Sequence, residues 1–223
     1  MNHTLEASIF IGGAPCSGKS TLAARLSREL GVDHYKCDDH FSRHLDEAFD
    51  AGREYATIAK SVTHEYIFMR SDLENFQFAI GIHSEEFEFI LNDLAVLNRP
   101  LIVEGCSVVP ELVAKAGVPR SNVVYLIPNE SFHREKYAQD RPWAWDRLQE
   151  TSNPEQAYEN WMNRDAMLAK YIHDEALRFG YWVREVGHST DFNALYSDVR
   201  SIVRQSAANK PLHRTPRSGA GEL

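Results

Sequence analysis

Residues 8–21 read Ser-Ile-Phe-Ile-Gly-Gly-Ala-Pro-Cys-Ser-Gly-Lys-Ser-Thr, and this stretch decides the fold. Its segment from Gly13 to Ser20 matches the phosphate-loop pattern G-x-x-x-x-G-K-[ST] at every fixed position. The apolar run Ser8–Gly12 predicts a buried strand before the loop, and leucines at helical spacing in Thr21–Leu30 predict a helix after it. A glycine-rich turn between a strand and a helix N-terminus directs backbone N–H groups at a phosphate. The sequence therefore predicts a nucleotide phosphate site.

The loop gives its side chains separate tasks. Lys19 is placed to act as a cation at the outer phosphates, and the hydroxyl of Ser20 is placed to ligate Mg²⁺. The predicted cofactors are therefore ATP and Mg²⁺, and the loop alone does not distinguish ATP from GTP. The predicted nucleotide contacts are Gly13, Ala14, Pro15, Cys16, Ser17, Gly18, Lys19, Ser20 and Thr21.

The composition is that of an ordinary globular protein. Of the 223 residues 43% are hydrophobic, and 24 basic against 32 acidic residues give a net charge of −8. This negative charge disfavours nucleic acid and anionic membranes as partners, and no apolar run approaches the roughly 18 residues of a membrane-spanning helix. Three cysteines, an odd number, suit a reducing compartment better than a disulfide framework. We therefore expect a cytoplasmic protein, and the composition leaves its oligomeric state open.

Four further segments are predicted to be strands. Leu101–Glu104 and Val123–Ile127 are almost wholly apolar, as strands covered on both faces are. Val32–Cys37 and Tyr181–Val186 include charged residues and therefore predict edge strands. Because helical patterns alternate with the strands, the predicted fold class is α/β with a doubly wound, five-stranded parallel sheet. The apolar pattern alone allows the strand orders 2-3-1-4-5 and 2-1-3-4-5.

The stretch between the second and third strands is too long for one crossover helix. We expect about three helices there, as an insertion over residues 40–97 above the carboxyl edge of the sheet. They are predicted around His40–Asp50, Thr57–Arg70 and Ser84–Leu97. Asn153-Pro154 predicts the start of a long helix, and a last helix begins near Thr190. One domain is expected over residues 1–206, followed by a mobile tail over 207–223.

With this loop and this alternation, the chain resembles the P-loop kinases of small molecules. That broad group includes nucleoside, nucleotide, gluconate and shikimate kinases and the phosphotransferases that act on antibiotics. The resemblance spans roughly Ala7–Arg204, and only the phosphate loop is highly specific. It implies the strand order 2-3-1-4-5, a lid over about residues 129–150, and a small-molecule acceptor. It does not identify the acceptor, because acceptor pockets in this group are built from variable insertions.

Two adjacent acids follow the second strand. Many kinases of the group that the chain resembles have an aspartate at this point in contact with the acceptor hydroxyl, which here would be Asp38 or Asp39. A carboxylate there can orient the hydroxyl, accept its proton, or bind Mg²⁺ through water. The alternative is that one of them caps the next helix. The sequence favours Asp39 slightly over Asp38.

The third strand ends in Glu104-Gly105, the pattern of a Walker B element with Glu in place of Asp. The carboxylate of Glu104 would hold Mg²⁺ through water or activate a nucleophile, and Gly105 lets the chain pass close to a bound ligand. The alternative is a solvated acid at a strand end.

Two arginines mark the predicted lid. The resemblance implies that Arg134 and Arg141 bring positive charge to the transferred phosphoryl group. They are seven residues apart, so they share a face if one helix continues through both, and Pro142 is expected to end that helix just after Arg141. The alternative is that the arginines pair with acids on a solvated helix, namely Glu130, Glu135 or Asp140.

Three weaker signals concern the same edge of the sheet. The three cysteines form either a redox-sensitive group or, as we favour, small buried residues. The phenylalanines of the insertion form an acceptor wall or, as we favour, its core. Two arginines of the insertion are candidates for holding a phosphate or carboxylate of the acceptor. These residues are Cys16, Cys37 and Cys106; Phe68, Phe76, Phe78, Phe87 and Phe89; and Arg53 and Arg70.

The predicted function is that of an ATP- and Mg²⁺-dependent kinase acting on a small metabolite such as a nucleoside, nucleotide or sugar acid. A regulatory ATPase that switches partners and a nucleotide-binding protein without catalysis remain alternatives. The predicted catalytic residues are Lys19, Asp38, Asp39, Glu104, Arg134 and Arg141, and the predicted metal ligands are Ser20 and Glu104.

Overall fold

A computed structural model describes residues 3–208, and within them five parallel strands form one sheet. The order β2-β3-β1-β4-β5 confirms the predicted 2-3-1-4-5 topology and the outermost positions of the second and fifth strands. The strands are β1 (Ile9–Gly13), β2 (Asp33–Lys36), β3 (Leu101–Glu104), β4 (Val123–Pro128) and β5 (Trp182–Val186).

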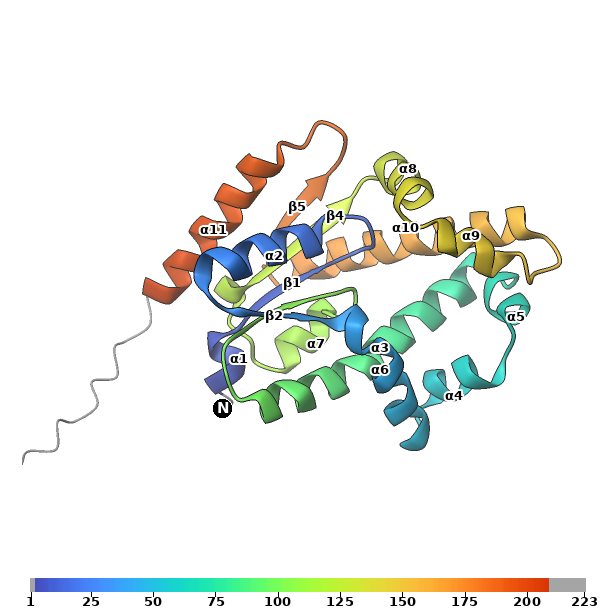
Figure 1. Cartoon of the computed structure of the whole chain (residues 1–223), viewed down its shortest axis with the longest axis horizontal. Coiled ribbons are helices and arrows are strands. Elements are labelled where there is room, and N and C mark those ends of the chain that lie inside the picture. Colours follow the sequence, from blue (N-terminus) through green and yellow to red (C-terminus); the bar gives the residue numbers. More distant parts are fainter. Residues whose placement is uncertain (1–2, 209–223) are drawn as a thin grey trace, which may run out of the picture.

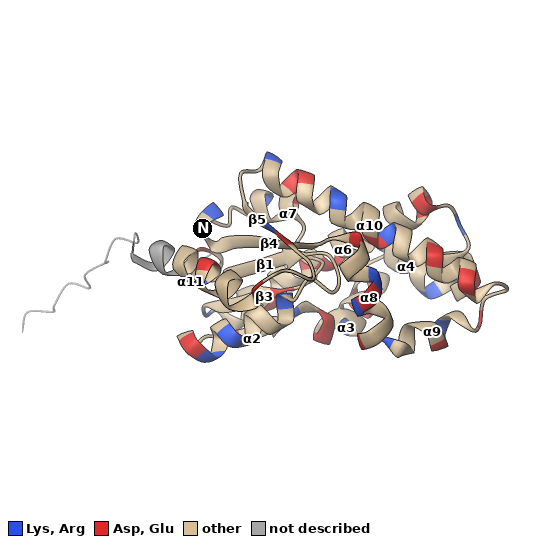
Figure 2. Ribbon diagram, turned by 90° about the horizontal axis from the view of Figure 1, so that it is seen from above, with Lys and Arg blue, Asp and Glu red and all other residues tan. Residues whose placement is uncertain are grey.

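The central strand β1 is buried along its whole length between β3 and β4. Phe10 pairs with Val103 on one side and with Val123 on the other, so the apolar runs recognised in the sequence meet in register. Figure 2 shows charged residues of both signs spread over the outer helices, whereas β1 and β4 carry none. The sheet is thus stabilised by removing apolar side chains on both faces from water.

Helices cover both faces of the sheet (Figure 1). One face packs against α2 (Lys19–Leu30) and α11 (Phe192–Ala208), which contribute Leu22 and Leu195 among others. The other face packs against α6, α7 and α10, which contribute Ile90, Val113 and Leu168 among others. Helices α6, α7 and α10 span Asp72–Leu97, Pro110–Lys115 and Pro154–Arg178, respectively. A short helix, α1, covers His3–Ala7.

The insertion differs in detail from the expected three helices. It contains α3 (Cys37–Asp50), α4 (Glu54–Ser61), α5 (His64–Phe68) and α6. The predicted helix Thr57–Arg70 is two short helices, because Thr63 adopts an extended conformation and its side chain caps α5 by accepting from the Tyr66 N–H. The helix predicted from Ser84 begins twelve residues earlier, at Asp72.

The early start of α6 has a local cause. Ser71 and Glu74 form a capping box in which each side chain accepts a hydrogen bond from the backbone N–H of the other residue. Within α6 the ring of Tyr55 packs against Gly81 where a Cβ would lie, so a side chain at this position would clash. The result is a continuous helix of 26 residues that joins the insertion to the core.

The lid region is a pair of short helices, α8 (Glu130–Asp140) and α9 (Pro142–Leu148). Pro142 ends α8 as predicted and is the first residue of α9. In Figure 1 these two helices, α4 and α5 lie beyond the carboxyl ends of the strands, and α6 runs from that end back along the sheet. Within residues 3–208 no helix is long and apolar enough to cross a membrane. The predicted tail over 207–223 lies outside the described residues except for Ala207 and Ala208, which end α11.

Candidate active site

The phosphate loop joins β1 to α2 through three residues of positive φ. Gly13 has φ 132°, and a Cβ there would lie 1.9 Å from the carbonyl oxygen of Leu126 in β4. Cys16 has φ 59° and Gly18, at the N-cap of α2, has φ 82°. Left-handed residues alternating with right-handed ones bring successive backbone N–H groups to face one point. The loop therefore has the backbone form that the sequence pattern requires.

Lys19 is held back across this loop. Its side chain is buried, and Nζ donates to the carbonyl oxygen of Ala14 at 2.6 Å and lies 3.5 Å from Oγ of Ser17. Because two oxygens of the loop contact this buried ammonium, its position beside the loop is well defined. The charge is therefore in place for a phosphate that the loop binds.

Glu104 ends β3 and is 2% exposed. Burial raises the pKa of its carboxyl, but His34, the charge of Lys19 and the hydroxyl of Ser20 outweigh burial and hold the pKa below its usual range. His34 Nε2 lies 3.5 Å from Oε1 of Glu104, yet Oε1 makes no hydrogen bond with the residues described. A buried carboxylate oxygen that makes no hydrogen bond is available for a cation.

These donors fit Mg²⁺. The ion takes hard oxygen ligands, usually one or two from side chains, and fills its remaining positions with water and phosphate oxygens. Ser20 and Glu104 supply such oxygens at one place, beside the phosphate loop. Over residues 3–208 no group of three or more His, Cys, Asp or Glu side chains forms a dedicated metal cage. The donor set therefore suits a nucleotide-bound Mg²⁺.

The two aspartates after β2 lie in the first turn of α3 but differ in environment. Asp38 lines the cavity above the phosphate loop. The Asp39 side chain is 65% exposed and forms an ion pair of 3.2 Å with Lys36, outside that cavity. The slight preference for Asp39 is therefore reversed. A Cβ on Gly105 would lie 2.6 Å from Cβ of Cys37, so the absence of a side chain there lets β3 and α3 approach closely.

The two lid arginines are also separated. Arg141 lines the cavity at the end of α8, with its guanidinium 5.1 Å from the ring centre of Tyr137. Arg134 is outside the cavity wall and donates to Glu130 and Glu159 at 3.1 and 2.9 Å. Arg134 therefore forms ion pairs with acids on the helix surface, as in the alternative interpretation of the lid arginines. The two residues share no face because the helix ends at Asp140.

A group on α10 escaped the sequence analysis. Asp165 is 1% exposed and accepts hydrogen bonds from Nε2 of His133 at 3.2 Å and Nε of Arg164 at 2.9 Å. Burial raises its pKa, but the charge of Arg164 and the hydrogen bond from His133 outweigh burial and keep the pKa below its usual range. Arg164 lines the cavity and lies over the ring of Trp161. The sequence did contain a signal for this group, because Asp165 lies on the same helical stripe as the apolar residues Trp161 and Leu168.

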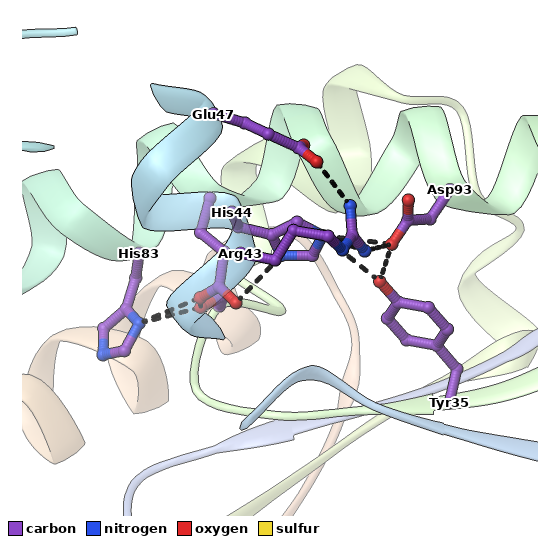
Figure 3. A network of polar contacts seen from close by, with 8 residues as sticks. Tyr35, Arg43, His44, Glu47, His83 and Asp93 are labelled. Atoms are coloured by element: carbon purple, nitrogen blue, oxygen red, sulfur yellow. Dashed lines mark hydrogen bonds and ion pairs between the residues drawn. The ribbon is translucent and has the colours of Figure 1, made fainter. Parts of the chain in front are cut away.

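A second polar network supports the insertion side (Figure 3). His44 is fully buried, with Nδ1 3.3 Å from Glu86 and Nε2 3.0 Å from Asp93. Asp93 also accepts from Tyr35 and Arg43, which ties α3 and α6 to β2. At the other end of this network His83 lines the cavity. The helices of the insertion are thus cross-linked by polar contacts as well as by apolar packing.

Lys19, Asp38, Glu104, Arg141 and Arg164 line one cavity of about 1230 Å³. Phe68 and Phe78 belong to its wall, while two of the other three phenylalanines pack in the main core against the sheet and one packs in a small cluster of α3, α4 and α6. Arg53 and Arg70 are not in the wall. Those three phenylalanines are Phe76, Phe87 and Phe89.

The three cysteines are all free thiols near this end of the sheet. Cys16 and Cys106 line the cavity, and Cys37 is buried beside it. Burial raises the pKa of the Cys16 thiol and raises that of Cys106 to about 11. The thiols are therefore protonated at neutral pH, the form that reacts slowly with oxidants. This favours the interpretation as small buried residues.

The comparisons with known proteins concern the fold. No protein-family model matches the chain, and no curated protein matches its sequence. Among solved structures, the chain is similar to shikimate kinase from Acinetobacter baumannii in complex with shikimate, with a TM-score of 0.47 and 16% sequence identity. The match covers 95% of this chain and 99% of that chain. The fold assignment follows from the strand order and the phosphate loop.

Proposed function

We propose that the protein transfers the γ-phosphoryl group of ATP to a hydroxyl of a small molecule, with Mg²⁺ as cofactor. One observation carries the proposal: a single cavity joins the phosphate loop, the strand-end acids Asp38 and Glu104, and a wall built by the insertion. Its volume of about 1230 Å³ exceeds the roughly 300–1,000 Å³ of pockets for one small ligand. The cavity therefore has room for a nucleotide and an acceptor together.

In the proposed reaction the acceptor oxygen attacks the γ-phosphorus, an O–P bond forms, and the bond to the β–γ bridging oxygen breaks so that ADP leaves. Asp38 orients the attacking hydroxyl and accepts its proton. Lys19 and Arg141 neutralise the charge that develops on the phosphoryl oxygens. Mg²⁺, when bound, supplies positive charge to the phosphate oxygens, and Ser20 and Glu104 would hold it.

The lid supports the exclusion of water. Arg141 and Trp143 reach the cavity from adjoining helices, and α9 packs against α10 through Ala144, Leu148 and Trp161. Closure of this lid over a bound acceptor would favour transfer over hydrolysis. A regulatory ATPase has no comparable need for a second, lined compartment.

The test compares Asp38→Asn with Asp39→Asn in the full chain, using ADP release with and without a panel of acceptor alcohols. Asp38→Asn is expected to lower acceptor phosphorylation by about 10²-fold or more, with ATP binding unchanged because the loop and Lys19 hold the nucleotide. Asp39→Asn is the matched control, and its activity stays within about threefold of the parent.

Two results would overturn the proposal. One is that no acceptor stimulates ADP release above the background, which is the behaviour of an ATPase switch. The other is that the two aspartate variants behave alike. Running the same assay with GTP in place of ATP identifies the preferred nucleotide.

A further inference from the structure

The insertion's part of the cavity wall is mainly apolar, and among the described residues its titratable side chains are His64 and His83. Within the described insertion, residues 40–97, no Asp, Glu, Lys or Arg lines the cavity. The wall consists mainly of apolar side chains from all four helices of the insertion. Six of them are Phe41, Leu45, Ile67, Phe68, Phe78 and Ile82.

The insertion is not short of charged residues, but they are used elsewhere. Arg53 pairs with Glu88 at 2.6 Å on the surface, and Lys60 pairs with Asp46. Arg70 lies over the rings of Tyr66 and Phe78, outside the cavity wall. The cations that the sequence offered for an acceptor's phosphate or carboxylate therefore do not reach the acceptor compartment.

The cations of the cavity belong to its other parts. Lys19 comes from the phosphate loop, and Arg141 and Arg147 come from the lid. Arg164 of α10 is paired with the buried Asp165, so its charge is already compensated. Lys136 of α8 also lines the cavity, so its Lys and Arg side chains come from the phosphate loop, the lid and α10, and none comes from the insertion.

One polar side chain of the insertion wall is held in a fixed orientation. His83 Nδ1 lies 2.8 Å from Oγ of Ser107, and the Ser107 hydroxyl donates to the buried carboxylate of Glu86. Because Ser107 donates its only proton to Glu86, Nδ1 of His83 must be the donor in their contact. In the tautomer that carries its proton on Nδ1, Nε2 is an acceptor, and within residues 3–208 no partner binds it. Figure 3 shows His83 at the end of this network.

We propose that the acceptor is an uncharged alcohol with an aromatic or otherwise apolar body, seated against the insertion wall with a hydroxyl donated to Nε2 of His83. This inference rests on the proposed kinase function and narrows it. Nucleosides and aromatic alcohols belong to the class, whereas nucleotides and sugar acids do not. An anionic group against this wall would lose its hydration without gaining a cation.

The experiment uses pairs of compounds that differ in one charged group. The pairs are phenylpropanediol with phenyllactate, and thymidine with thymidine 3′-monophosphate, which keeps the 5′-hydroxyl; gluconate and shikimate are added as polar acids. Phosphorylation by the full chain is measured as acceptor-dependent ADP release. The neutral member of each pair is expected to have a kcat/KM about 10²-fold higher, since burial of an unpaired charge is the cost that distinguishes them. A preference for the anionic members would overturn the inference.

Binding is measured separately from catalysis through tryptophan fluorescence, because Trp143 and Trp161 line the cavity. With a non-hydrolysable ATP analogue present, the neutral compounds are expected to change the emission at lower concentrations than their anionic counterparts. If the neutral compounds bind with this preference but are not phosphorylated, the proposed kinase function is wrong. The proposal that the insertion wall binds an uncharged alcohol is then still supported. If no neutral compound binds, the assignment of the compartment fails.

A charge introduced into the wall gives a second readout. Leu45 is half-buried in the wall, so Leu45→Lys can be accommodated, and it is expected to shift the preference toward phenyllactate by about tenfold. Leu73→Lys is the matched control, because Leu73 is 54% exposed on α6 and outside the cavity. Equal preferences in Leu45→Lys, Leu73→Lys and the parent protein would count against an acceptor bound at this wall.

Discussion

The phosphate-loop side and the insertion side of the cavity are built from different kinds of groups. The first uses backbone groups in a tightly curled turn, Lys19, and the charged ends of strands. The second uses uncharged side chains that project from four separate helices. A turn of fixed spacing can be predicted from the sequence. A wall that is assembled from scattered positions can be identified only once the fold is known. The following changes break or sharpen this contrast.

Lys19→Met is expected to have the largest effect. Removing the ammonium should lower turnover by about 10³-fold or more, because charge on the migrating phosphoryl group is no longer neutralised. Lys60→Met is the control, since Lys60 pairs with Asp46 on the surface of the insertion. Turnover and circular dichroism of both variants check the prediction. Near-normal turnover in folded Lys19→Met would remove the phosphate loop from the mechanism.

Arg141→Ala and Arg134→Ala should separate the two lid arginines. Arg141 faces the cavity, and its loss is expected to lower transfer and background hydrolysis together, each by about 10²-fold. Arg134 binds surface acids, and its loss should change turnover by less than about threefold. Steady-state rates with and without acceptor give both values. Equal losses in the two variants would show that the lid arginines are not divided in this way.

The insertion side should be the more sensitive to acid. Burial disfavours the charged form of Glu86, but hydrogen bonds from His44, His83 and Ser107 outweigh burial and lower its pKa from 4.5 to about 2. A depressed carboxyl pKa stabilises the fold above pH 4.5, and this stability is lost as the pH falls toward 2. At 1.36 kcal/mol per pH unit the loss amounts to about 3 kcal/mol.

Urea unfolding between pH 3 and pH 7 tests this expectation. Glu86→Gln should flatten the acid limb of the free energy of unfolding relative to the parent protein, whatever its stability at neutral pH. Glu88→Gln is the control, because Glu88 is exposed and pairs with Arg53. Burial lowers the pKa of His44, but Glu86 and Asp93 outweigh burial and raise it above its ordinary value. The protonated His44 therefore stabilises the fold at pH values below that ordinary pKa, and this stabilisation is lost as the pH rises. An unchanged acid limb in Glu86→Gln would assign the acid sensitivity to other carboxyls.

Arg53→Ala should have the smallest effect. Its exposed ion pair with Glu88 is expected to contribute less than about 1 kcal/mol to stability, and its loss should leave the KM of every acceptor unchanged. Thermal unfolding and acceptor kinetics provide the two measurements. A raised KM confined to anionic acceptors would place Arg53 at the acceptor after all.

The sequence allowed the sheet and the phosphate loop to be predicted because both depend on local patterns, namely apolar runs and a fixed glycine spacing. It did not rank Asp38 above Asp39, since neighbouring residues on a helix differ by about 100° in direction and only packing shows which one faces the cavity. Arg134 and Arg141 could not be separated until the end of α8 was known. The pair of Arg164 and Asp165 was missed because its meaning comes from His133 on another helix.

The central position of β1 has a consequence for synthesis on the ribosome. Its two partners are Leu101–Glu104 and Val123–Pro128, so the nascent chain cannot complete the middle of the sheet until about ten seconds after β1 is made, at ~10 residues per second. During that interval both edges of an apolar strand are unpaired. Unpaired edges of this kind promote aggregation, which chaperones prevent. The phosphate loop is thus among the first segments to be translated, but the strands that flank it are completed much later, and a chain truncated before Leu101 is expected to bind no ATP.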